Sequence, residues 1–149
     1  MVKIRQADQH DFRGCLECVP LDWRSAAFEA RLGVQLWKDY IFVAEDDTNK
    51  IVGYIACDSE FFDADGFYLR TMLVREMSRR QGVGKDLIMT ATKWAFSRGV
   101  RRVFIDVPDR GWARTLEKAG FEKVGEVKHL HAEGSVYEIY SLKSGSPIY

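Results

Sequence analysis

The alternation of apolar and polar positions predicts a succession of strands and helices along the chain. Helices are expected at residues 9–19, between an N-cap at Asp8 and a stop at Pro20, and at residues 24–38, as one helix or two because of Gly33. Short apolar runs rich in β-branched and aromatic residues predict strands in this half at residues 3–7, 41–44, 51–57 and 67–74. The first half should therefore combine a helical pair with an antiparallel meander.

A helical stripe of apolar residues marks the start of the second half. Its members recur on one face and end before Gly99: they are Val83, Leu87, Ile88, Ala91, Trp94 and Ala95. A strand at residues 102–107, a helix from an Asp109 cap to a stop at Gly120, and strands at 121–130 and 136–142 should follow. The pattern predicts an α/β (α+β) fold, with about seven strands in a mixed, mostly antiparallel sheet and four helices.

Composition restricts the classes of protein. A length of 149 residues suits one domain, residues 1–149, and 22 basic against 22 acidic residues give no field that would favour nucleic acid. The N-terminus lacks a signal-peptide pattern and no apolar run is long enough to span a membrane, so a cytoplasmic protein is expected. Cys15 and Cys18 have the CxxC spacing without a second ligand pair, which favours packed, reduced thiols over a metal site.

A basic, glycine-containing loop joins the strand at residues 67–74 to the long helix. Glycines let an anion approach the backbone, and the helix start offers unpaired N–H groups with the positive end of a dipole. A Walker A loop would need Gly at Arg79 and Ser or Thr at Asp86, and a dinucleotide fingerprint would need Gly at Leu87. The loop therefore predicts a site for another phosphorylated ligand.

This segment resembles the acetyl-CoA signature of the GCN5-related N-acetyltransferase (GNAT) superfamily. The residues from Arg79 to Gly84 match the pattern Gln or Arg, two residues, Gly, one residue, Gly or Ala, and the segment from Asp109 to Phe121 resembles a second family landmark. The resemblance implies a sheet splayed between its fourth and fifth strands, acetyl-CoA as co-substrate and no metal. The residues that would bind acetyl-CoA are Met72, Leu73, Val74, Arg79, Arg80, Gln81, Gly82, Val83, Gly84, Lys85 and Asp109.

The resemblance also implies catalytic roles. Asp106 stands where relatives that acetylate protein N-termini look to have Glu, and it is the expected base. The alternative interpretation is an Asp on the solvent face of its strand, alternating with Ile105 and Val107. The other candidate bases lie in an acidic loop: Glu60, Asp63 and Asp65.

Two positions depart from the family pattern. Asp109 replaces the usual Asn, and Leu116 replaces the Tyr often assigned as general acid. Tyr68, Tyr137 and Tyr140 are candidate replacements, and water could protonate the thiolate of CoA. Trp112 stands where the family tends to have a small residue, so it either narrows the cofactor cleft or packs the helix.

The expected function is acetyl transfer from acetyl-CoA to a primary amine of a small molecule or protein, by direct attack in a ternary complex. A non-catalytic acyl-CoA sensor is the alternative, because Asp109 and Leu116 depart from the pattern. Neither nucleic acid nor membrane is expected as a partner, a homodimer is left open, and the sequence does not identify the amine.

Overall fold

The computed structural model describes residues 2–38, 40–58, 66–107, 110–128 and 134–145. The chain falls into two compact units, each built from two stretches of sequence. The first unit combines Met1–Asp58 with Arg70–Lys93, and the second combines Ser59–Leu69 with Trp94–Tyr149. The expectation that residues 1–149 form a single domain stays a prediction.

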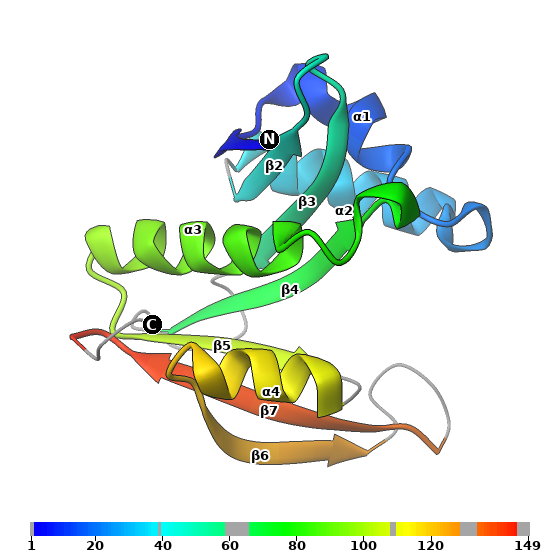
Figure 1. Ribbon diagram of the computed structural model, residues 1–149. Helices are drawn as coiled ribbons and strands as arrows, with labels where there is room; N and C mark the ends of the chain where they lie inside the picture. The colour runs from blue at the N-terminus through cyan, green and yellow to red at the C-terminus, as the bar shows by residue number, and fades with distance from the viewer. Residues whose placement is uncertain (1, 39, 59–65, 108–109, 129–133, 146–149) are drawn as a thin grey trace. The chain divides into compact units, whose positions relative to one another are not determined.

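The described residues contain a mixed sheet of seven strands (Figure 1). The strands are β1 (Lys3–Gln6), β2 (Ile41–Glu45), β3 (Ile51–Asp58), β4 (Gly66–Val74), β5 (Arg102–Val107), β6 (Glu122–Lys128) and β7 (Val136–Lys143). Their order in the sheet is β1-β2-β3-β4-β5-β7-β6. The pairs β1/β2, β2/β3, β5/β7 and β6/β7 are antiparallel, and β4/β5 is parallel. The predicted mixed, mostly antiparallel sheet is thus confirmed.

The parallel pairing between β4 and β5 is short. It joins the first residues of β4, Gly66 to Leu69, with Arg102 to Ile105, while β4 itself continues to Val74. All of these paired residues belong to the second unit. The family resemblance implied that the fourth and fifth strands diverge. A ladder limited to the first residues of β4 agrees with that expectation.

Four α-helices accompany the sheet in the described part of the chain, as predicted. They are α1 (Phe12–Leu16), α2 (Ala26–Trp37), α3 (Val83–Ser97) and α4 (Arg110–Lys118). Three short 3₁₀ helices are also present: η1 (Gln9–Asp11), η2 (Leu21–Trp23) and η3 (Glu76–Ser78). No sequence pattern predicted η2 or η3, because isolated turns of this kind leave no periodic signal.

The segment predicted as one helix over residues 9–19 begins and ends with tighter turns. Asp8 caps its start as expected: its carboxylate accepts the His10 N–H at 2.8 Å, and the Asp11 carboxylate accepts the Asp8 N–H at 2.9 Å. The first turn is η1, and only Phe12–Leu16 is α-helical. At the other end the Cys18 N–H donates to the Cys15 carbonyl, three residues back, so the α-helical pattern has already ended.

Helix α2 is continuous, which answers the question that Gly33 raised. Ser25 caps it by accepting the Phe28 N–H at 3.1 Å. Leu32 and Leu36 are buried, one helical turn apart. A glycine within a helix costs stability but does not break the helix when a buried face holds it in place.

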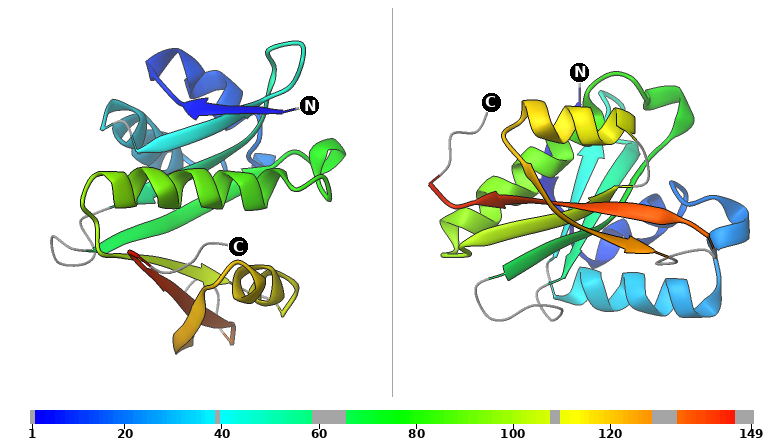
Figure 2. Two further views of the ribbon diagram at one scale, coloured as in Figure 1. Left: turned by 60° about the vertical axis from the view of Figure 1, so that its left-hand side comes forward. Right: turned by 90° about the horizontal axis from the view of Figure 1, so that it is seen from below.

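The core of the first unit lies between its helices and its strands. Helices α1 and α2 contact each other and β3. Figures 1 and 2 show α2 and α3 on opposite faces of β3. The buried side chains of this core come from the first helical pair, β2 and β3, and they include Cys15, Leu32, Leu36, Ile41, Val43 and Tyr54.

In the second unit, helix α4 packs on one face of β5 and β7. Val103, Ile105 and Val107 are buried on β5, and they alternate with half-buried residues on the other face. On α4, Ala113 and Leu116 are buried. Helix α4 and β5 therefore bury apolar faces against each other, and Arg102, Phe104 and Asp106 lie on the other face of β5.

Candidate functional site

The loop between β4 and α3 is held at its start by backbone hydrogen bonds. The Arg75 N–H donates to the Val52 carbonyl at 2.7 Å, just beyond the end of β4. Within the loop, the Ser78 N–H donates to Arg75 O at 2.8 Å and the Arg79 N–H to Glu76 O at 3.2 Å. The Arg79 side chain then reaches back, with Nε 3.0 Å from the Val74 carbonyl. These bonds bring Arg79 next to the end of β4.

Two residues of this loop adopt the left-handed backbone conformation. Arg80 has φ of 64° and Gly82 has φ of 80°. The first backbone bond of α3 runs from the Asp86 N–H to the Gly82 carbonyl at 3.0 Å. Among the described residues, no backbone carbonyl accepts from the N–H groups of Arg80 to Lys85. A row of free N–H groups in such a conformation, at a helix start, forms a concavity suited to an anion.

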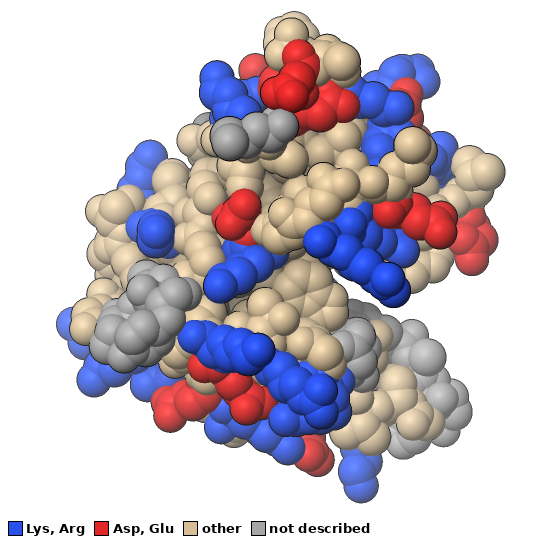
Figure 3. Space-filling view, in the orientation of Figure 1, with Lys and Arg blue, Asp and Glu red and all other residues tan. Residues whose placement is uncertain are grey.

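The surroundings of Gly82 leave space for a ligand. A Cβ placed on Gly82 would have nothing within 4 Å. Arg79, Arg80 and Gln81 are exposed, and Lys85 is half-buried. In Figure 3, basic side chains gather beside the loop that precedes α3. The loop therefore has the donors, the space and the positive charge that an anion such as a diphosphate requires.

The remaining predicted residues of this segment contribute in other ways. Met72, Leu73 and Val74 are half-buried on β4, and Leu73 packs against the core of the first unit. Val83 and Gly84 are buried at the start of α3. These residues can act on a ligand through main-chain atoms, as the resemblance implies.

In the second unit, Asp106 and Tyr68 form a hydrogen-bonded pair, in which the Tyr68 hydroxyl donates to the Asp106 carboxylate. Tyr68 is the parallel partner of Phe104, two residues before Asp106. Side chains two apart on a strand share a face, so the register places Tyr68 and Asp106 together. Both residues are half-buried. The sequence nominated each separately, as base and as acid, but not as a pair.

The other two candidate tyrosines lie on opposite faces of β7. Ile139 is the partner of Asp106, so Tyr137, two residues earlier, shares the face of Asp106. Tyr140 is the partner of Ile105 and therefore faces α4. Only Tyr68 and Tyr137 lie on the same face of the strands as the candidate base.

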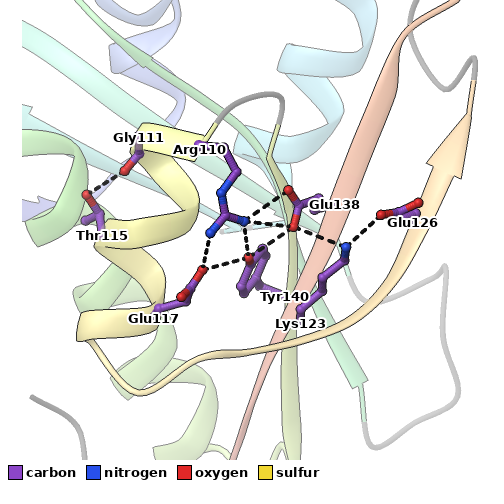
Figure 4. A network of polar contacts seen from close by, with 8 residues as sticks. All are labelled: Arg110, Gly111, Thr115, Glu117, Lys123, Glu126, Glu138 and Tyr140. Atoms are coloured by element: carbon purple, nitrogen blue, oxygen red, sulfur yellow. Dashed lines mark hydrogen bonds and ion pairs between the residues drawn. The ribbon is translucent and has the colours of Figure 1, made fainter.

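A polar network that the sequence did not predict surrounds the Tyr140 hydroxyl (Figure 4). Arg110 Nη1 donates to this hydroxyl at 3.2 Å, and Arg110 Nη2 lies 3.0 Å from Glu117 Oε1. The hydroxyl itself lies 3.0 Å from Glu117 Oε1 and 3.2 Å from Glu138 Oε2. Lys123 bridges Glu126 at 2.6 Å and Glu138 at 3.4 Å. The network links α4 to β7 and β6.

The network changes the acidity of its members. Burial raises the pKa of the Tyr140 phenol, and its hydroxyl is surrounded by partners. Burial alone would raise the pKa of Glu138, but the hydrogen bonds from Arg110 and Tyr140, together with the nearby Lys123 ammonium, outweigh it and lower the pKa of that carboxyl. Tyr140 is therefore a structural residue of this network, and its hydroxyl is poorly suited to give up a proton.

Several predicted residues lie outside the described part of the chain: Asp109, Glu60, Asp63 and Asp65. Leu116, which takes the place of the usual family Tyr, is buried on α4 and has no group that could transfer a proton. Trp112 on the same helix is half-buried.

The cysteines fit the packing role predicted for them. Cys15 and Cys18 are buried free thiols, and burial raises the pKa of both. Cys18 Sγ lies 3.5 Å from the Gly14 carbonyl. Within the described ranges, no group of three or more His, Cys, Asp or Glu side chains is arranged to hold a metal ion. No helix in those ranges is both long and apolar enough to cross a membrane.

Known proteins match this chain in sequence and in fold. The sequence matches the profile of the acetyltransferase (GNAT) family over residues 3–121. The acetyltransferase Atu2258 of Agrobacterium fabrum is 29% identical over 108 residues, which are 72% of this chain and 76% of that protein.

Two solved structures show the same fold at low identity. An acetyltransferase of the GNAT family from Bacillus cereus has a TM-score of 0.80 at 19% identity, and the match covers 98% of this chain and 99% of that one. The ribosomal-protein-S18-alanine N-acetyltransferase of Escherichia coli has a TM-score of 0.78 at 17% identity, with coverage of 98% and 96%. Because the profile spans most of the sequence, the chain belongs to the acetyltransferase (GNAT) family and is an N-acetyltransferase.

Proposed function

We propose that this protein transfers the acetyl group of acetyl-CoA to a primary amine and binds the diphosphate of CoA in the loop at residues 79–85. The observation that carries the proposal is the row of N–H groups from Arg80 to Lys85, which donate to no backbone carbonyl among the described residues. The row contains two left-handed residues, Arg80 and Gly82, and leads into α3. Diphosphate oxygens would accept these hydrogen bonds and lie at the positive end of the helix dipole.

Each part of the loop has a separate task in this proposal. Gly82 allows the anion to approach the backbone, because a side chain there would occupy the open space beside it. The Arg80 guanidinium is exposed and adds positive charge, whereas Arg79 is bonded to the Val74 carbonyl. The backbone of Met72, Leu73 and Val74 would bond the pantetheine arm, and an N–H there would stabilise the developing oxyanion.

Asp106 is the proposed general base. An alkyl amine has a pKa of about 10 and is mostly protonated at neutral pH, so a proton must leave before attack. Asp106 would accept that proton, directly or through a water molecule. The Tyr68 hydroxyl bonded to Asp106 would hold the carboxylate in one orientation.

The transfer itself needs no covalent enzyme intermediate. The amine nitrogen attacks the thioester carbon, the new C–N bond forms, and the C–S bond breaks with its electron pair leaving on sulfur. The nitrogen then loses its surplus proton to water and becomes the neutral amide. Water can protonate this leaving group, because a thiol has an intrinsic pKa of about 8.5 and its thiolate is tolerable near neutrality. The absence of a Tyr at Leu116 therefore does not prevent the reaction.

The test is release of free thiol from acetyl-CoA in the presence of a panel of amines. The panel contains a peptide with a free N-terminus, lysine, a polyamine, other amino acids and an amino-group antibiotic. We expect at least one amine to raise thiol release well above the rate of hydrolysis and to gain an acetyl group by mass spectrometry. Acetyl-CoA binding with no release for any amine would instead favour the acyl-CoA sensor.

A further inference from the structure

Arg75 lies at the junction between β4 and the loop at residues 79–85, and it makes three contacts there. Its N–H donates to Val52 O at 2.7 Å, and its Nε donates to Ile51 O at 2.9 Å. Its Nη2 lies 3.0 Å from Oε2 of Glu17, the residue that caps the C-terminus of α1. Arg75 therefore bonds two successive carbonyls of β3 and a carboxylate at the C-cap of α1.

The acceptors of Arg75 are themselves held in a packed junction. Gly14 of α1 lies so close to Ile51 that a Cβ on Gly14 would be 2.6 Å from Ile51 Cδ1. Cys18 Sγ also approaches the Ile51 carbonyl, at 3.8 Å. The side chain of Arg75 is 22% exposed, so its hydrogen bonds are partly shielded from water. Helix α1, the start of β3 and Arg75 thus form one contact cluster within the first unit.

The loop takes its shape from this cluster. Ser78 donates its N–H to the Arg75 carbonyl, and Arg79 reaches back to the carbonyl of Val74. Both of these bonds close the turn that precedes the free N–H groups of Arg80 to Lys85. A shift of Arg75 would move both acceptors and, with them, the direction of those N–H groups.

We propose that Arg75 is a positioning residue for the acetyl-CoA loop, and that Glu17 at the C-cap of α1 supports it. The proposal rests on the proposed function of the loop. Arginine suits this role because its planar guanidinium directs Nε and Nη2 to two separate acceptors, whereas the single ammonium of lysine lacks that fixed geometry. Arg75 does not contact the ligand in this account and acts through the backbone of the loop.

The experiment compares Arg75→Gln, Arg75→Lys and Glu17→Gln with a control, Arg13→Gln. Arg13 is an exposed arginine on α1, the helix that Glu17 caps. The control therefore removes one positive charge, as Arg75→Gln does, from a position near Glu17. The measurements are the Kd of CoA by calorimetry and the kcat and KM with acetyl-CoA as varied substrate, after circular dichroism has established folding.

We expect Arg75→Gln to raise Kd and KM about tenfold, the scale of one lost hydrogen bond to a charged group, with kcat at saturating acetyl-CoA within about twofold. Arg75→Lys should recover only part of this loss, and Glu17→Gln should raise KM about twofold to threefold. Arg13→Gln should match the wild type. A purely structural role would reduce folded protein without this selective change in KM.

Folded Arg75→Gln with wild-type KM and Kd would overturn the inference. If Arg75→Gln does not fold, Glu17→Gln decides, and a wild-type KM for that variant would likewise overturn it. Gly82→Asp separates this inference from the proposed function. If Gly82→Asp weakens CoA binding and the Arg75 variants do not, only the positioning role fails; if none of them weakens it, the loop is not the site.

Discussion

The two units build their polar groups in different ways. In the first unit the candidate ligand site is made of backbone N–H groups from Arg80 to Lys85, and charged side chains such as Arg5 and Arg75 link structural elements. In the second unit the groups of interest are side chains on strand faces, as in the pair Tyr68 and Asp106. A backbone site depends on conformation and tolerates many side chains, whereas a side-chain site depends on strand register and on one functional group.

The largest predicted effect removes the functional group of the second unit. Asp106→Asn keeps the shape and a carbonyl that can accept from Tyr68, but it cannot accept the amine proton, so kcat at neutral pH should fall roughly 10²-fold or more. Acetyl-CoA affinity should stay near the wild-type value. The mutant should recover part of its deficit toward about pH 9–10, where solution supplies neutral amine.

The companion variant Tyr68→Phe sharpens this result. It leaves the carboxylate in place and removes only its hydrogen-bond donor, so the loss of rate should be smaller than that of Asp106→Asn. If Asp106→Asn retained the wild-type rate at neutral pH, Asp106 would be a polar strand residue and the acids between positions 58 and 65 would be the next candidates.

The next effect tests the structural use of charge in the first unit. Asp11 is 9% exposed in its side chain, and its two oxygens each lie 2.8 Å from an Arg5 nitrogen. Asp11→Asn leaves Arg5 without this partner and should lower the free energy of unfolding by about 1–2 kcal/mol in urea titrations. In the second unit, Glu138→Gln should cause a smaller loss of the free energy of unfolding, because Arg110 is 56% exposed and can be solvated. Equal losses would erase the contrast between the units.

The comparison of Asp11→Asn with the wild type also predicts a pH dependence. The hydrogen bond from Arg5 lowers the pKa of Asp11 below its ordinary value. A depressed pKa stabilises the folded state above the unfolded value of about 3.9, and this stabilisation disappears as the pH falls through the folded value. The gap in stability between wild type and Asp11→Asn should therefore close below about pH 3.9, and a gap that stayed constant into strong acid would contradict this cause.

The smallest effect compares two glycines that differ in backbone conformation. Neither Gly33 nor Gly82 would bring a new Cβ within 4 Å of another atom, but only Gly82 has a positive φ, of 80°. Gly33→Ala should stabilise the protein by about 0.5–1 kcal/mol because α2 is an ordinary helix there. Gly82→Ala should destabilise it by about 1 kcal/mol because alanine resists the left-handed region. Tm shifts of the same sign would show that the loop conformation is not what Gly82 provides.

The sequence predicted the elements whose signal is local. Helix α3 follows an apolar stripe and ends near Gly99, which has φ of 90° as a C-terminal glycine should. The helix expected at residues 9–19 was wrong at both ends, because apolar spacing does not distinguish an α-helical turn from a 3₁₀ turn. The loop was predicted from its glycines, but the left-handed backbone of Arg80 could not be, since a non-glycine residue gives no sign of it.

Sequence reasoning failed where the site depends on distant partners. Tyr68 and Asp106 are 38 positions apart in the sequence. They meet only because β4 and β5, which α3 separates along the chain, pair side by side in a parallel register. The network of Arg110, Glu117, Glu138 and Tyr140 needs α4 to pack on β7, and no local pattern encodes that contact. Charged residues near a turn are common, so their spacing alone gives no reason to pair them.

The most direct test of the central claim is calorimetric titration of CoA into the wild type and Gly82→Asp. The substitution places both bulk and negative charge where the diphosphate would lie, so CoA affinity should fall at least tenfold, about 1.4 kcal/mol, while circular dichroism reports a folded protein. The loop would then be the anion site that this account describes. A folded Gly82→Asp protein that binds CoA as tightly as the wild type would contradict it.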